Sequence, residues 1–130
     1  MADHPNAETL RQGYAAFQAG DLEKVRSLFT ADIAWHLPGH NHFSGEHKGV
    51  DNVLDLFMRN FAETDGTFKV ALHDVLGNDE HAVALATVSG VREGRSLSDR
   101  YAHVVHFQDG KVSESWIFGE NQDQVDAFWT

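Results

Sequence analysis

The stretch YAHVVHFQDGKVSESWIF, residues 101–118, decides the fold prediction. Asp109-Gly110 lies between two alternating runs and predicts a two-residue hairpin turn, because both central positions of such a turn need positive φ. With Gln108 paired to Lys111, regular alternation places one set of side chains on a single face: Tyr101, His103, Val105, Phe107, Val112, Glu114, Trp116 and Phe118. This aromatic face includes an imidazole and a carboxylate, which are costly to bury unless they are paired or used. The hairpin is therefore the candidate wall of a site.

A period of two extends back along the chain and predicts strands at 67–76, 81–91, 95–107 and 111–119. Turns are expected at Asn78-Asp79 and Glu93-Gly94. If Glu93-Gly94 is a two-residue turn, Ala84 pairs with His103, Ala86 with Tyr101 and Val88 with Asp99. Small side chains opposite large ones leave room for a cavity. The count assumes no β-bulge, because one extra residue inverts the faces beyond it.

The first half of the chain has helical periodicity. Apolar residues from Ala7 to Phe17 predict a first helix that ends at Gly20, and Asp21 is a natural N-cap for a second. A short strand at 32–37 and a third helix with an apolar stripe over 50–61 follow, and 121–129 predicts a short last helix. Helices followed by an antiparallel meander indicate one α+β domain over residues 1–130.

Composition excludes several classes of function. The formal charge of −10 argues against nucleic acid and anionic membranes, which both need a basic surface. The absence of cysteine excludes disulfides, thiolate metal sites and cysteine nucleophiles. No apolar run has the length of a membrane span, and the opening residues Met1 to Thr9 are polar, so a cytoplasmic protein is expected.

The opposite face of the same strands is more apolar than a solvated sheet face should be. It is expected to carry Val83, Leu85, Val91, Ala102, Val104 and Ile117. We expect a second copy of the protein to cover it, giving a two-fold homodimer.

The chain resembles the SnoaL-like, ketosteroid-isomerase-like branch of the NTF2-like superfamily. The resemblance rests on Gly20-Asp21-Leu22, on Leu28-Phe29 with Asp32 and Pro38, and on Asp109-Gly110-Lys111-Val112 with Glu114 and Trp116. It implies a cone-shaped α+β barrel, in which a strongly curved, mostly antiparallel sheet packs against three N-terminal helices and a short C-terminal helix. It also implies an apolar pocket and a dimer. Members include isomerases, polyketide cyclases, epoxide hydrolases, dehydratases and proteins that only bind.

The isomerase residues of that family transfer poorly to this chain. The general-base aspartate falls on Leu37, the catalytic tyrosine falls one residue before Tyr14, and the protonated acid falls on His103. Leucine cannot accept a proton, so isomerisation by that mechanism is not expected. Epoxide hydrolysis needs an aspartate, an arginine and a second aspartate around one water, but the adjacent Asp99 and Arg100 point to opposite faces.

His103 and Glu114 are the candidate catalytic pair, because regular alternation makes them diagonal neighbours on the aromatic face. As general acid and base they could move a proton to and from a carbon next to a carbonyl, as an isomerase or a cyclase requires. The alternative is a structural pair without turnover, in a ligand-binding or interaction module of the same fold. No cofactor is expected.

The expected ligand is a small hydrophobic organic molecule, because aromatic walls favour flat apolar compounds. The residues expected to bind it are Tyr14, Trp35, Leu37, Phe57, Phe61, Tyr101, Val105, Trp116 and Phe118. Four histidines crowd the segment from His36 to His47, the others being His40 and His42. Their spacing matches no defined zinc pattern, so they are interpreted as solvated loop residues and no metal is expected.

Overall fold

The computed structural model describes residues 3–130, and Met1 and Ala2 of the polar opening segment lie outside the described residues. The helices are α1 (Pro5–Gln18), α2 (Leu22–Ser27), α3 (Val50–Ala62) and α4 (Gln122–Trp129). The strands are β1 (Phe29–Leu37), β2 (Gly45–Lys48), β3 (Lys69–Gly77), β4 (His81–Arg92), β5 (Arg95–Gln108) and β6 (Lys111–Gly119). This order confirms the α+β class, with three helices before the β3–β6 meander and one after it.

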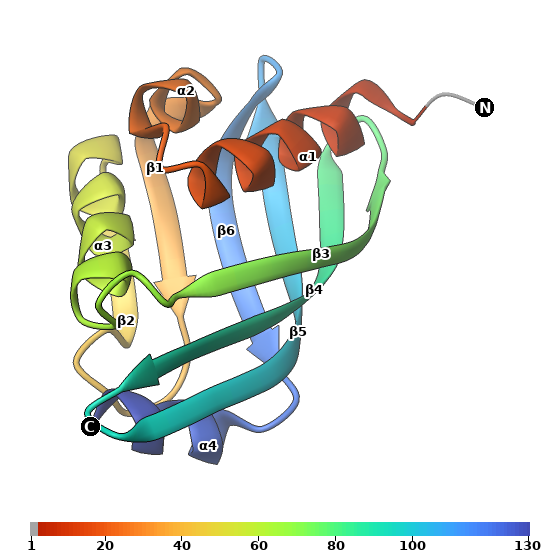
Figure 1. Ribbon diagram of the computed structural model, residues 1–130. Helices are drawn as coiled ribbons and strands as arrows, with labels where there is room; N and C mark the ends of the chain where they lie inside the picture. Colours follow the sequence, from red (N-terminus) through yellow and green to blue (C-terminus); the bar gives the residue numbers. More distant parts are fainter. Residues whose placement is uncertain (1–2) are drawn as a thin grey trace.

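The six strands form one open sheet in the order β2-β1-β6-β5-β4-β3. Every neighbouring pair is antiparallel except β1 and β6, which are parallel. Figure 1 shows a strongly curved sheet, with α1 across its hollow side, α3 beside β1 and α4 at the end near the β4–β5 turn. The concave face of the sheet is therefore the face that the helices cover.

The local signals for turns and caps are confirmed. Asp109 and Gly110 have φ of +52° and +78°, and Glu93 and Gly94 have the same pair of values. The Asp21 side chain accepts a hydrogen bond from the Lys24 backbone N–H at 3.1 Å and so caps α2. The β4–β5 register also agrees with prediction, since Ala84 lies opposite His103 and Ala86 opposite Tyr101.

The β5–β6 register differs from the regular count. Phe107 lies opposite Val112, but His106 lies opposite Glu114, so Ser113 is an extra residue in β6. Such a bulge inverts the faces of all residues beyond it. Ser115, Ile117 and Gly119 consequently take inner positions. The prediction that Glu114, Trp116 and Phe118 face inward is wrong, and so is the outward placement of Ile117.

Aromatic residues from helices and strands fill the core beneath the sheet. The Trp35 ring centroid lies 5.0 Å from that of Phe57 and 5.9 Å from that of Phe29. Phe17 packs on Phe57 from α1, and Phe61 packs on Phe17 at 4.9 Å. Aromatic pairs at these separations stabilise a core beyond their area alone. Within residues 3–130, no helix combines the length and apolar character that a bilayer span requires.

Candidate functional site

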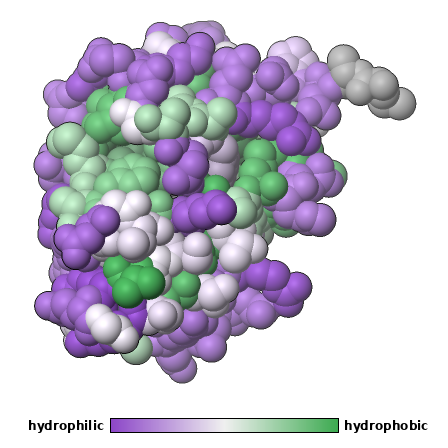
Figure 2. All heavy atoms as spheres, in the orientation of Figure 1, coloured by the Kyte–Doolittle hydropathy of each residue, from purple (hydrophilic) through white to green (hydrophobic). Residues whose placement is uncertain are grey.

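An apolar cavity of about 170 Å³ lies between the helices and the inner face of the sheet. Its volume is comparable to the roughly 150 Å³ of an engineered cavity that binds benzene. Figure 2 shows hydrophobic side chains exposed between more hydrophilic rims on this side of the molecule. The predicted residues that line the cavity are Tyr14, Trp35, Leu37, Phe57, Tyr101, His103 and Val105. Phe61 is not among the lining residues, because its ring packs on Phe17 and Phe68.

Strand β5 places three polar side chains in a row along the cavity wall. Asp99, Tyr101 and His103 alternate with outward residues, so all three point to the inner face. Alternate residues of a strand lie roughly 6.5 Å apart, which allows one small molecule to contact two of them. Asp99 is 5% exposed and His103 is 3% exposed. Polar groups in such positions need hydrogen-bond partners.

A chain of hydrogen bonds crosses the inner wall from α1 to β6. The Tyr14 hydroxyl oxygen lies 2.9 Å from the Tyr101 hydroxyl oxygen and 2.9 Å from His103 Nδ1. On the other side of the ring, His103 Nε2 lies 2.6 Å from Ser115 Oγ. Both ring nitrogens of His103 are thus occupied by protein groups. The imidazole links Tyr14 to Ser115, and its two nitrogens are both engaged by these side chains.

Burial keeps the members of this chain uncharged near neutral pH. Loss of hydration lowers the pKa of His103 to about 3 and raises the pKa of Tyr101 to about 12. Burial, followed by the neighbouring Tyr101 phenol, raises the pKa of Tyr14 well above its usual value. A neutral imidazole has one N–H donor and one acceptor nitrogen. Each group in this chain of hydrogen bonds therefore donates to one neighbour and accepts from the other, and none of them carries a charge.

Asp99 is an ionisable group of the cavity wall that takes no part in this chain of hydrogen bonds. Its Oδ1 accepts a hydrogen bond from the Asn121 backbone N–H at 3.1 Å, but its buried Oδ2 has no hydrogen-bond partner within residues 3–130. Burial raises the pKa of Asp99, and the nearby Glu120 carboxylate adds to the increase. A Cβ on Gly119 would lie 2.8 Å from Oδ2, so the glycine makes room for this oxygen. A perturbed carboxyl group in an apolar cavity is a candidate functional group.

The predicted His103–Glu114 pair does not exist. The bulge at Ser113 sends Glu114 to the outer face, where its Oε2 lies 2.7 Å from His36 Nε2. The His36 ring stacks on Trp116 with the centroids 5.5 Å apart and the planes at 9°. Phe118 is 60% exposed on the same outer face. Glu114, Trp116 and Phe118 therefore lie outside the cavity.

The interpretation of His36 and His47 as solvated loop residues is wrong, because His36 lies in β1 and His47 in β2, and both rings bond to protein groups. His42 Nε2 lies 2.7 Å from Glu63 Oε1, and His47 Nε2 lies 2.7 Å from the Phe43 carbonyl oxygen. His36 is engaged by Glu114, as described above. These contacts give each of the three a structural partner.

Asp99 and Ser115 are the site residues that sequence reasoning missed. Asp99 could have been predicted from the sequence, because the same register count that pairs Val88 with Asp99 places this carboxyl on the inner face. Ser115 was not, because its inward position exists only beyond the bulge.

Comparison with known proteins gives the family. The family model for a SnoaL-like domain matches residues 10–115. Uncharacterised proteins of Mycobacterium tuberculosis and Mycobacterium bovis are 32% identical over 130 residues, with 99% of each chain covered.

Solved structures agree with this match. Bal32a, from a soil-derived mobile gene cassette, superposes with a TM-score of 0.95 at 35% identity, covering 97% of both chains. IdmH of Streptomyces antibioticus, a proposed polyketide cyclase, has the same fold with a TM-score of 0.76 at 20% identity, over 94% of this chain and 96% of IdmH. The arrangement of helices and curved sheet is thus shared with these proteins, and the chain belongs to the SnoaL-like family.

Proposed function

We propose that this protein binds a small, flat, apolar molecule with a carbonyl group and transfers a proton at the carbon beside that carbonyl. The observation that carries the proposal is the unpaired Oδ2 of Asp99, buried in an apolar cavity one inward position from the Tyr101 hydroxyl. An apolar pocket with a few convergent polar groups is the usual form of a small-molecule site. The proposal replaces His103 and Glu114 by Asp99 as the proton-transfer group.

Asp99 acts as the base. Its carboxylate takes the proton from the carbon beside the carbonyl, and the C–H electron pair forms a C=C bond as the carbonyl oxygen becomes negative. The protonated Asp99 then returns the proton to the same carbon or to another carbon of the enolate. Its raised pKa makes the carboxylate a stronger base than an exposed aspartate.

Tyr101 supplies the hydrogen bond that stabilises the negative oxygen. In the required arrangement, Ser115 Oγ–H donates to His103 Nε2, His103 Nδ1–H donates to Tyr14, and Tyr14 O–H donates to Tyr101. The Tyr101 O–H is then free to donate to the ligand. A donor already oriented in a water-poor site stabilises developing charge strongly. Tyr14, His103 and Ser115 are positioning residues in this scheme, because they act through Tyr101.

The family supports this class of reaction. Removal of a proton beside a carbonyl also begins an intramolecular aldol-type ring closure, which is the kind of reaction a polyketide cyclase performs. Arg100, which an epoxide hydrolase would need at its centre, faces outward and pairs with Glu120. The alternative function is a binder of the same ligand class without turnover.

Deuterium exchange tests the proposal. With 2-tetralone in D₂O as the probe, we expect the protein to accelerate loss of the α-proton signals in NMR spectra, because the proton held by Asp99 exchanges with solvent and a deuteron is then returned to the carbon. Asp99→Asn should lower this acceleration at least 100-fold, because general base catalysis contributes roughly 10²–10⁴-fold. Tyr101→Phe should lower it by a smaller factor.

Two controls make the result decisive. Glu114→Gln removes a carboxylate from the outer face and should leave exchange unchanged. Asp99→Asn should unfold in urea at a midpoint no lower than that of the wild type, because it removes a buried charge with an unpaired oxygen. Equal exchange in wild type and Asp99→Asn would overturn the assignment. A rise in Tm with 2-tetralone, without any accelerated exchange, would favour the non-catalytic binder.

A further inference from the structure

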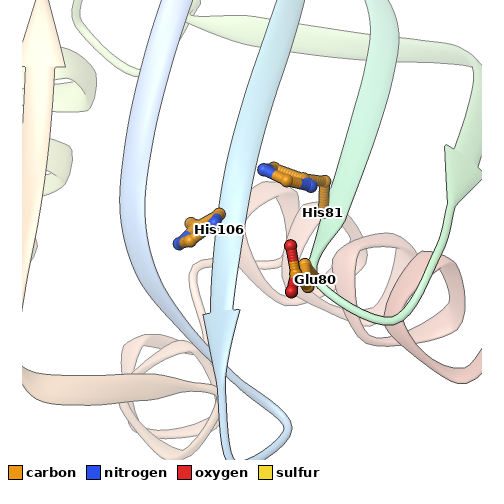
Figure 3. A group of neighbouring side chains, drawn as sticks. All are labelled: Glu80, His81 and His106. Atoms are coloured by element: carbon orange, nitrogen blue, oxygen red, sulfur yellow. The ribbon is translucent and has the colours of Figure 1, made fainter.

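Three metal-ligating side chains meet on the outer face of the sheet, away from the cavity. Glu80 lies in the β3–β4 turn, His81 begins β4, and His106 lies directly opposite His81 on β5. One ligand atom from each of the three lies within 4.8 Å of the others. Figure 3 shows the two imidazole rings and the carboxylate gathered at this corner of the sheet. We propose that Glu80, His81 and His106 bind a divalent transition-metal ion such as Zn²⁺.

The backbone that carries these side chains is held in place. Asn78 Oδ1 accepts hydrogen bonds from the backbone N–H groups of Glu80 at 3.0 Å and His81 at 2.8 Å. The Glu80 carbonyl oxygen accepts from the Phe107 N–H at 2.9 Å, which ties the turn to β5 beside His106. Ligands on a fixed backbone lose little entropy when they bind an ion.

The three side chains are free to act as ligands. Among residues 3–130, none of the three side chains has a hydrogen-bond or ion-pair partner, unlike His36, His42 and His47. The His81 and His106 ring centroids are 4.5 Å apart. Ligand atoms around a tetrahedral Zn²⁺ are roughly 3.3 Å apart, as follows from bonds of about 2.0–2.1 Å. Small rotations of these half-buried or exposed side chains bring the ligand atoms to that separation.

The donor set determines which ions fit. Imidazole nitrogens suit Zn²⁺, Ni²⁺ and Cu²⁺, whereas Ca²⁺ and Mg²⁺ need oxygen ligands. Two imidazoles and one carboxylate leave a fourth tetrahedral position, which water can fill because Glu80 is exposed. This site lies on the opposite face from Asp99 and near the other end of β5, so it is independent of the proposed proton transfer.

Isothermal titration of the full chain with ZnCl₂ tests the proposal. We expect one saturable site per chain that CaCl₂ and MgCl₂ do not fill. His106→Gln, His81→Gln and Glu80→Gln should each weaken Zn²⁺ binding at least tenfold, with the histidine changes more severe than the glutamate change. Three separate variants keep the test valid if one of them fails to fold.

Matched controls distinguish this site from the other histidines of the chain. His42→Gln and His36→Gln should leave the affinity unchanged, because these rings already bond to carboxylates. Anomalous scattering at the zinc edge from a Zn²⁺-soaked crystal should locate the ion between His81 and His106. Unchanged affinity in the His81→Gln/His106→Gln double variant, or an ion located elsewhere, would overturn the assignment.

Discussion

His103 shows how burial changes what a single residue can do. In the sequence it is a candidate acid or base, because an ordinary histidine titrates near neutral pH. In the folded protein it is 3% exposed and lies between Tyr14 and Ser115, and burial lowers its pKa to about 3. It therefore serves as a neutral link between two hydroxyl groups. Asp99, two inward positions away on β5, has the unpaired carboxylate oxygen and is the proton-transfer group that we propose.

The first prediction concerns the titration of His103. The folded protein does not protonate this ring until about pH 3, whereas the unfolded chain does so below pH 6.5. The stability that this group contributes is therefore present above pH 6.5 and is lost as the pH falls from 6.5 toward 3. Between pH 7 and pH 5 the loss is about 2 kcal/mol of unfolding free energy. The ring resonances of His103 in NMR spectra should not shift between pH 8 and pH 5.

Urea denaturation of the wild type and of His103→Gln, each at pH 7 and pH 5, isolates this contribution. Asp99 has the opposite effect, because its raised pKa favours folding at low pH and that gain is lost as the pH rises through the folded value. Asp99 is common to both proteins, so the difference between their pH dependences reports on His103. The same pH dependence in both proteins, or a ring that titrates above pH 5, would contradict the prediction.

At the scale of elements, the bulge in β6 decides which side chains reach the cavity. Ser113 Oγ donates to the His106 carbonyl oxygen at 3.2 Å, which provides a local partner at the irregular step. Beyond that step, Ser115 replaces Glu114 on the inner face and completes the hydrogen-bond chain of His103. A serine can be buried there at little cost, because its hydroxyl has a partner. An unpaired glutamate in the same position would be strongly unfavourable.

The second prediction compares two tryptophans on opposite faces of the sheet. Trp35 is 8% exposed, and its ring contacts Phe57 and His103. Trp35→Ala should lower the free energy of unfolding by about 3–5 kcal/mol, the usual cost of removing a large buried ring. In a Phe118→Glu background, which the third prediction expects to be a single chain, Trp116→Ala should cost about 1 kcal/mol, because the ring lies on the outer face against His36. Urea denaturation measures both values, and similar costs would show that Trp116 is buried as deeply as Trp35.

At the scale of the whole molecule, the outer sheet face has an ordered pattern. Leu85, Ala102 and Phe118 lie side by side across β4, β5 and β6, and the next row holds Val83, Val104 and Trp116. Leu85 is 37% exposed and Phe118 is 60% exposed. Exposed apolar rows of this kind are typical of an interface between subunits. We therefore propose that a two-fold homodimer forms through these rows.

The third prediction tests that dimer by sedimentation equilibrium. The wild type should have the mass of two chains, and Leu85→Glu or Phe118→Glu should give the mass of one, because each places a charge in the apolar rows. Met58→Glu is the control, since Met58 is 51% exposed on α3 and should not affect the mass. Ile117 is unsuitable as a test site, because it lines the cavity and its change would disturb the core. A single-chain mass for the wild type would refute the interface.

The sequence by itself determined the four helices, the strands of the meander, the turns at Glu93-Gly94 and Asp109-Gly110, the cap at Asp21, the β4–β5 register and the family. These features depend on local spacing: Asp109-Gly110 needs positive φ wherever it occurs, and alternation between two such turns pairs Ala84 with His103. Only the tertiary structure decided the hydrogen-bond partners of His103 and left one oxygen of Asp99 without a partner. It also brought Glu80, His81 and His106 close together. The extra residue Ser113 reverses the inward and outward faces of the β6 residues that follow it, and no local sequence signal marks this bulge. Burial and pairing depend on groups far apart in the chain, so they become fixed only when helices and strands pack together.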